Sequence, residues 1–137
     1  MDIEKLDDMQ KDRLAELVES CFVEIALRLF ENNGMRVGIF LDKTWPRSSP
    51  GVAKNKWAAM KGKDPKTGKP ARCSISDAYR IVHTLGLKIG YVVIQAEALA
   101  EERLEAEIKK EAEARAARPE TAAPGGKRRR AAPAPPE

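Results

Sequence analysis

Apolar side chains recur every three or four residues between positions 9 and 33, the spacing that puts them on one face of a helix. This stripe consists of Leu14, Leu17, Val18, Cys21, Phe22, Ile25, Leu29 and Phe30. Aspartates crowd the first turns, where the helix dipole favours negative charge. Gly34 follows Asn33 and suits a left-handed helix end. The pattern therefore predicts a helix over residues 9–33.

Two shorter helices are predicted next. Residues 35–43 are mostly apolar, and periodicity alone does not separate helix from strand there. We expect a two-turn helix, because the stretch lies between helical signals and has no evident partner strand. After a turn at residues 44–49, Ser49 and Pro50 are typical of a helix start. The second helix should span residues 49–61, with Ala53, Trp57 and Met60 facing inward and Gly51, Lys54, Asn55, Ala58 and Lys61 facing outward.

The remaining chain predicts a loop, two more helices and a tail. Residues 63–73 contain two prolines and a glycine, which indicates a loop. Ser74, with Asp77 three residues later, resembles a capping box for the next helix, which Gly86 ends. A long helix should run from Ile89 to about residue 118, although the β-branched run at 92–94 leaves a short strand as an alternative. Residues 119–137 hold five of the nine prolines and no aromatic residue, so we expect a disordered tail.

The elements together predict an all-α protein of four or five helices. We expect a globular domain over residues 9–95, a charged extended helix over 96–118 and a Pro/Ala-rich basic tail over 119–137. No apolar run approaches the roughly 20 residues that cross a bilayer, so no membrane contact is expected. The acidic, polar start of the chain does not resemble a secretory signal, which favours a cytoplasmic location.

Charge is distributed unevenly along the chain. Its formal net charge is +4, but residues 1–34 hold four basic and nine acidic side chains, whereas residues 35–72 hold ten basic and two acidic ones. A basic region of this kind attracts polyanions. The alternative is a solvated, lysine-rich loop without a partner.

No set of residues predicts an enzyme, a cofactor or a metal site. The string from Gly62 to Lys69 resembles a phosphate-binding loop, but five residues separate its glycines where four are needed, and Pro70 stands at the magnesium-ligand position. His83 is the one histidine and has no evident catalytic partner. Cys73 lies among basic residues that could lower the pKa of its thiol; the alternative is an incidental thiol before a helix.

One stretch resembles a known family. Residues 74–87 read Ser-Ile-Ser-Asp-Ala-Tyr-Arg-Ile-Val-His-Thr-Leu-Gly-Leu. They follow a helix, turn and helix that ends with Trp57, Met60 and Gly62. Over residues 12–95 the chain resembles the lambda-repressor/Cro-like helix-turn-helix family of phage and prophage regulators, with a longer turn at 44–47 and a longer link at 63–73. The resemblance implies a lambda-repressor-like domain that binds double-stranded DNA.

The resemblance gives helix 49–61 the role of reading the major groove. Asn55 can pair with adenine, and Lys54 can reach guanine acceptors. Ser48, Ser49 and the first-turn amides suit phosphate. Phosphate contacts are expected from Arg36, Arg47, Lys61, Lys63, Lys66, Lys69 and Arg72. Lys66→Ala should then weaken binding to all sequences alike.

This hypothesis describes a repressor-like transcriptional regulator, of phage or prophage origin and associated with the nucleoid. A homodimer is expected through the helix that starts at Ile89, because one such domain reads half a site. The basic tract at residues 127–130 would add affinity for any sequence. Two alternatives stay open: a small-terminase-like DNA-packaging or architectural factor, and a helical adaptor that binds proteins.

Overall fold

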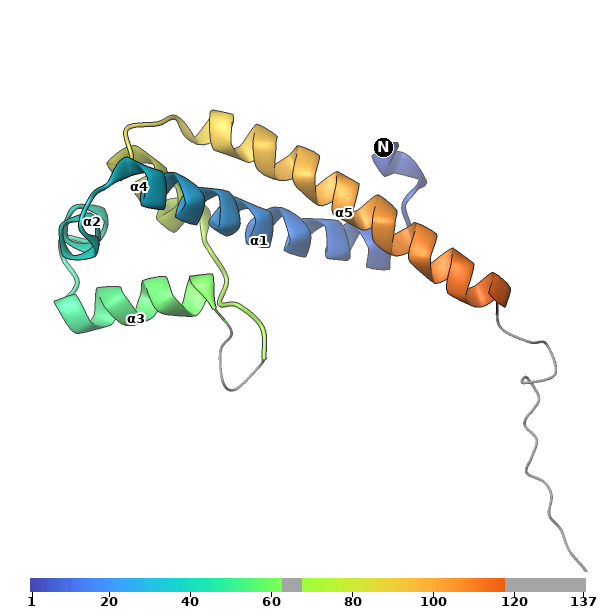
Figure 1. Cartoon of the computed structure of the whole chain (residues 1–137), viewed down its shortest axis with the longest axis horizontal. Helices are drawn as coiled ribbons and strands as arrows, with labels where there is room; N and C mark the ends of the chain where they lie inside the picture. The colour runs from blue at the N-terminus through green and yellow to red at the C-terminus, as the bar shows by residue number, and fades with distance from the viewer. Residues whose placement is uncertain (63–67, 118–137) are drawn as a thin grey trace, which may run out of the picture. The chain divides into compact units, whose positions relative to one another are not determined.

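The computed structural model describes residues 1–62 and 68–117. The predicted tail and its basic tract at 127–130, together with Lys63 and Lys66, lie outside these residues. The fold is all-α, as predicted. The described residues form a short 3₁₀ helix and five α-helices (Figure 1): η1 (Ile3–Lys5), α1 (Asp8–Asn33), α2 (Val37–Thr44), α3 (Pro50–Lys61), α4 (Ile75–Thr84) and α5 (Ile89–Ala117).

The described part of the chain divides into two units, the first ending at Leu104 and the second beginning at Glu105. The first unit holds η1 to α4 and the first part of α5. The first unit ends at Leu104, and the sequence predicts the boundary between the globular domain and the extended helix at residue 95. No described helix is long and apolar enough to cross a membrane.

The helix ends follow local capping chemistry. Asp7 and Gln10 form a reciprocal capping box at the start of α1, which the sequence reading did not identify. Gly34 ends α1 with a φ of 80°, a left-handed conformation that favours glycine. The predicted caps Ser49 and Ser74 accept backbone N–H bonds at the starts of α3 and α4. The helix predicted at 35–43 is confirmed as α2, and the strand alternative at 92–94 is wrong because these residues lie in α5.

An aromatic cluster joins α1, α2 and α3. The ring centroid of Phe40 lies 4.8 Å from that of Phe30, 5.0 Å from that of Trp57 and 6.5 Å from that of Trp45. The predicted inward residues of α3, Ala53, Trp57 and Met60, are all buried. Because these three side chains fix the rotation of α3 about its axis, the opposite face of α3 must point to solvent.

The first part of α5 packs through residues spaced four apart: Val92, Ala96, Ala100 and Leu104. Beside them, the Arg103 guanidinium donates two hydrogen bonds of 2.8 Å to Glu24 of α1. Its Nη1 also lies 3.4 Å from the sulfur of Cys21, which is fully buried, as predicted for a core cysteine. The hydrogen bonds from Arg103 lower the pKa of Glu24. This contact fastens α5 to α1 near the end of the first unit.

Candidate nucleic-acid interface

The solvent-facing side of α3 is the surface that the sequence singled out. Its five predicted members, Gly51, Lys54, Asn55, Ala58 and Lys61, are all exposed. Small residues flank Asn55, and a Cβ atom added at Gly51 would meet no heavy atom within 4 Å. The middle of the face therefore carries one polar side chain, that of Asn55, between two small residues, and another molecule can approach the backbone closely at Gly51. We call Gly51, Lys54, Asn55, Ala58 and Lys61 the α3 face.

The lysines of α3 have different surroundings. Lys54 forms no ion pair with any described residue, and its side chain is exposed. Lys61 lies at the C-terminal end of α3 with its Nζ atom 5.5 Å from the centre of the Trp57 ring. Both lie on one edge of the α3 face. Lys56 lies on the other edge, where α3 meets α4.

Lys56 is held by a carboxylate and by an aromatic ring. Its Nζ atom is 3.0 Å from Oδ1 of Asp77 in α4 and 5.5 Å from the centre of the Trp45 ring. The indole N–H of Trp45 donates to the same Asp77 oxygen at 2.9 Å. Asp77 itself is buried, and its backbone N–H donates to the Ser74 hydroxyl.

The charge state of Asp77 follows from these contacts. Burial raises the pKa of Asp77, but the hydrogen bonds from Trp45 and Lys56 outweigh it and hold the pKa below its usual value. Asp77 is therefore an anion at neutral pH that ties the α2–α3 turn and α3 to α4. The sequence reading assigned Asp77 only to helix capping. The position of Asp77 next to Ala78, on the buried stripe of α4, could have indicated a buried carboxylate that needs a partner.

A second pair of contacts ties the end of α2 to α4. The Thr44 hydroxyl is fully buried and donates to the Thr84 hydroxyl at 2.9 Å. The backbone oxygen of Thr44 accepts a hydrogen bond from Arg80 at 3.2 Å. Together with the contacts of Trp45, these bonds fix the segment that leads into α3, which keeps the α3 face in one orientation.

The start of α3 carries the predicted phosphate-binding residues. The Ser49 hydroxyl accepts the N–H of Val52, and the backbone N–H of Ser48 donates to the carbonyl of Trp45. Arg47 is exposed in the turn before α3, and Arg36 is exposed at the start of α2. Neither arginine forms an ion pair with a described residue. Both positive charges are accordingly available to an anionic partner.

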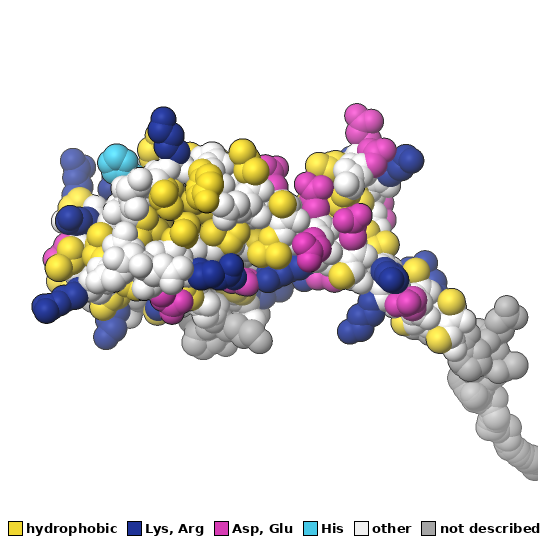
Figure 2. Space-filling view, turned by 45° about the horizontal axis from the view of Figure 1, so that its top comes forward, with side chains coloured by type: hydrophobic (Ala, Val, Ile, Leu, Met, Phe, Trp, Pro, Cys, Tyr) yellow, Lys and Arg dark blue, Asp and Glu magenta, His cyan; other side chains and the backbone are white. Residues whose placement is uncertain are grey.

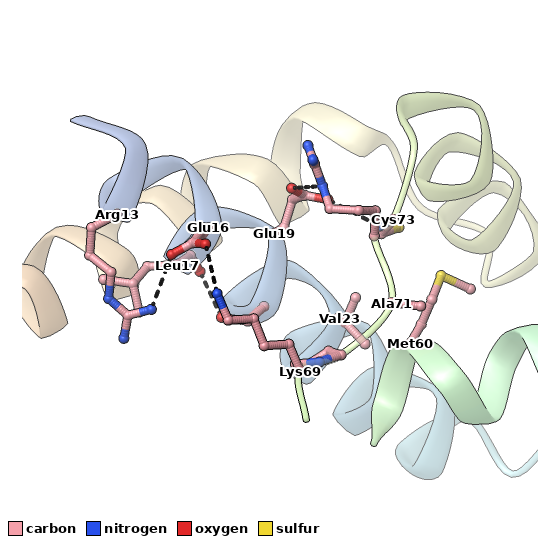
Figure 3. A pocket seen from close by; sticks show the side chains of 12 residues that line it. Arg13, Glu16, Leu17, Glu19, Val23, Met60, Lys69, Ala71 and Cys73 are labelled. Atoms are coloured by element: carbon pink, nitrogen blue, oxygen red, sulfur yellow. Dashed lines mark hydrogen bonds and ion pairs between the residues drawn. The ribbon is translucent and has the colours of Figure 1, made fainter. Parts of the chain in front are cut away.

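Lys69 and Arg72 lie beside α1, and each has an acidic neighbour there. The Nζ atom of Lys69 is 3.8 Å from Glu16 (Figure 3). The Nε atom of Arg72 is 2.8 Å from Glu19. Glu19 also accepts the backbone N–H of Cys73 at 3.0 Å. Residues 69–73 and α1 border a cavity of about 340 Å³. The structure therefore does not group these two residues with the α3 face, and each would have to exchange a carboxylate for a phosphate.

The surroundings of the half-buried Cys73 disfavour its thiolate form. Burial, with the nearby carboxylates of Asp77 and Glu19, raises the pKa of Cys73 to about 11. The expectation that basic neighbours lower this pKa is wrong, because Arg72 is paired with Glu19 and the attraction of Lys56 is outweighed.

Apolar side chains are exposed where α4 and α5 meet. Ile75 and Tyr79 of α4 are 81 % and 59 % exposed, and Tyr91 and Ile94 of α5 are 56 % and 68 % exposed. Tyr79 and Tyr91 line the same hollow. Figure 2 shows hydrophobic side chains gathered over much of the visible face. We call these four residues the α4–α5 patch; it includes the start of α5, where the sequence predicts a homodimer contact.

The chain matches no protein-family model, curated protein or solved structure. A function can therefore be inferred from the α3 face, from the contacts that orient it and from the α4–α5 patch.

Proposed function

We propose that this protein binds double-stranded DNA sequence-specifically, as a repressor-like transcriptional regulator that places α3 in the major groove. The observation that carries the proposal is the α3 face: five exposed residues, two of them lysines and none acidic, on a helix fixed from behind by buried Trp57. A helix of this diameter fits the major groove. Residues 35–62 add to the attraction for phosphates, with six basic side chains and one acidic one.

Each residue of this surface has a role in the proposal. Asn55, in the middle of the face, pairs with adenine, and Lys54 reaches the acceptors of guanine. Gly51 and Ala58 allow the helix backbone to come close to the bases. Phosphate contacts come from Arg36, Arg47 and Lys61, and from Ser48 and Ser49 with the first-turn amides of α3.

A second copy of the chain belongs to the proposal, because one helix of this kind reads half a site. The α4–α5 patch is the surface we propose for that contact. Ile94→Asp, which changes a side chain 68 % exposed, should leave the fold intact and shift the molecular mass in solution from dimer to monomer. A wild-type monomer would exclude the dimer, and a ring of many subunits would favour a DNA-packaging factor.

Selection of bound sequences from a random duplex pool tests DNA reading directly. The wild-type protein should enrich a motif that contains adenine, with two-fold symmetry if two copies bind. Asn55→Ala should relax the preference at one position of each half-site, at a cost of about 1–3 kcal/mol for the selected sequence. Binding of random duplex should stay nearly unchanged.

Asn32→Ala is the matched control, because Asn32 is an exposed asparagine near the end of α1. It should leave both the motif and the affinity as they are. Enrichment of no motif by the wild-type protein, or the same motif from Asn55→Ala, would contradict the proposal.

A further inference from the structure

Among the three lysines of α3, Lys56 is the one in contact with a buried carboxylate. The Asp77 oxygen that it contacts at 3.0 Å also accepts the Trp45 indole N–H, so its position is fixed from both sides. The face of the Trp45 ring adds a cation–π contact at 5.5 Å. The Lys56 side chain is nevertheless 42 % exposed, so it reaches the surface of α3.

The position of Lys56 matters for the chemistry of the α3 face. Lys54 and Lys61 lie on one edge of this face, and Lys56 lies on the other. A DNA duplex seated on Asn55 would bring phosphates along both edges, because the two strands border the major groove. A free ammonium group at position 56 would thus contribute a contact that is the same for every sequence.

We propose that Asp77 is a specificity-determining residue: it holds Lys56 away from the DNA phosphates and so limits sequence-independent binding. This inference rests on the proposed function. By neutralising one of the three lysines of α3, Asp77 leaves a larger share of the binding free energy to the base contacts of Asn55 and Lys54. It touches neither bases nor phosphates and acts through Lys56.

Asp77→Asn tests this proposal with little change of shape. The amide oxygen still accepts the Trp45 N–H, but the charge that holds Lys56 is gone. Binding of a random-sequence duplex should then become stronger, and the slope of log K against log salt should steepen by about 0.9, the value for one additional phosphate contact. The ratio of variant to wild-type affinity should grow about 3.5-fold when salt is lowered from 200 to 50 mM.

Variants at the lysines distinguish the proposed restraint of Lys56 from a role of Asp77 in folding alone. Lys56→Met alone should leave the wild-type slope unchanged, whereas Lys61→Met, which removes a proposed phosphate contact, should reduce its magnitude by about 0.9. The double variant Asp77→Asn/Lys56→Met should return to the wild-type slope. A role of Asp77 in folding alone would weaken binding to every duplex and would not steepen the slope.

Acylation of Lys56 by acetic anhydride, followed by mass spectrometry without DNA, tests the restraint independently. Lys56 should react faster in Asp77→Asn than in the wild type, while Lys54 reacts at the same rate in both. Equal Lys56 reactivity, or a slope lowered by Lys56→Met alone, would overturn the inference. If the wild-type protein binds no duplex while Lys56 reactivity rises, the proposed function fails and the restraint stands.

Discussion

The two tryptophans of the chain offer a matched comparison, because both are buried but only one has a hydrogen-bond acceptor. Trp45 and Trp57 are 5 % and 2 % exposed. The indole N–H of Trp45 donates to Asp77 at 2.9 Å. The indole N–H of Trp57 has no partner in the part of the chain that the structure describes. We predict that Trp45→Phe destabilises the protein more than Trp57→Phe.

The expected difference follows from the two N–H groups. Both substitutions remove the same atoms from the core, so the losses of packing largely cancel in the comparison. Trp45→Phe also removes a hydrogen bond to a charged group, which contributes about 1.5–3 kcal/mol. Trp57→Phe removes an unpaired buried donor, whose burial costs about 1–3 kcal/mol. Trp45→Phe should therefore lower the free energy of unfolding by at least about 2 kcal/mol more than Trp57→Phe does.

Urea unfolding at pH 7 measures this difference. Each variant keeps one tryptophan, so fluorescence reports unfolding in both, and circular dichroism at 222 nm checks that the transition is two-state. The slope of the free energy against urea should be the same in the two variants. Equal losses of stability, or a greater loss in Trp57→Phe, would refute the assignment of the two indole N–H groups.

Three further predictions concern Asp77, Cys73 and Glu19. Hydrogen bonds lower the pKa of Asp77 from its ordinary 3.8, so the stability that Asp77 contributes is present above about pH 4 and is lost as pH falls through the lowered pKa. Asp77→Asn should therefore flatten the plot of unfolding free energy against pH below about pH 4. With a pKa of about 11 in place of 9.0, Cys73 holds about 100-fold less thiolate at pH 8 than a free thiol does. Because a more basic thiolate is also more nucleophilic, iodoacetamide should alkylate Cys73 about 10-fold more slowly than a free thiol, and an equal rate would contradict the raised pKa. Glu19→Gln weakens the contacts to Arg72 and to the Cys73 N–H, so it should speed this alkylation, whereas an unchanged rate would mean that Glu19 does not hold the segment.

Local signals in the sequence predicted much of the fold. Ser49 and Ser74 begin helices by accepting the backbone N–H three residues later, Pro50 suits the first position of a helix, and Gly34 ends α1 in a left-handed conformation. These signals are local, so sequence spacing reveals them. The exposed side of α3 could be predicted for the same reason, since burial of Trp57 and Met60 fixes the opposite face.

Contacts between distant residues could not be predicted in this way. Asp77 looked like a capping residue because its neighbour Ser74 explains it locally, whereas its partners Trp45 and Lys56 are far away in the chain. Lys69 and Arg72 looked like phosphate contacts because the net charge of residues 35–72 does not show which side chains already face a carboxylate. Glu16 and Glu19, in a different helix, decide that question.

The two ends of α5 should unfold at different temperatures. Up to Leu104 the helix is held by buried side chains. From residue 105 to 117 its side chains are exposed apart from the partly covered Ile108, and the Glu111–Arg115 ion pair lies on its surface. A stretch of this length is close to the ~12–15 residues below which a solitary helix is marginal in water. Amide protons should therefore exchange faster toward Ala117, and warming should fray this end gradually, well before the first unit melts in a single step.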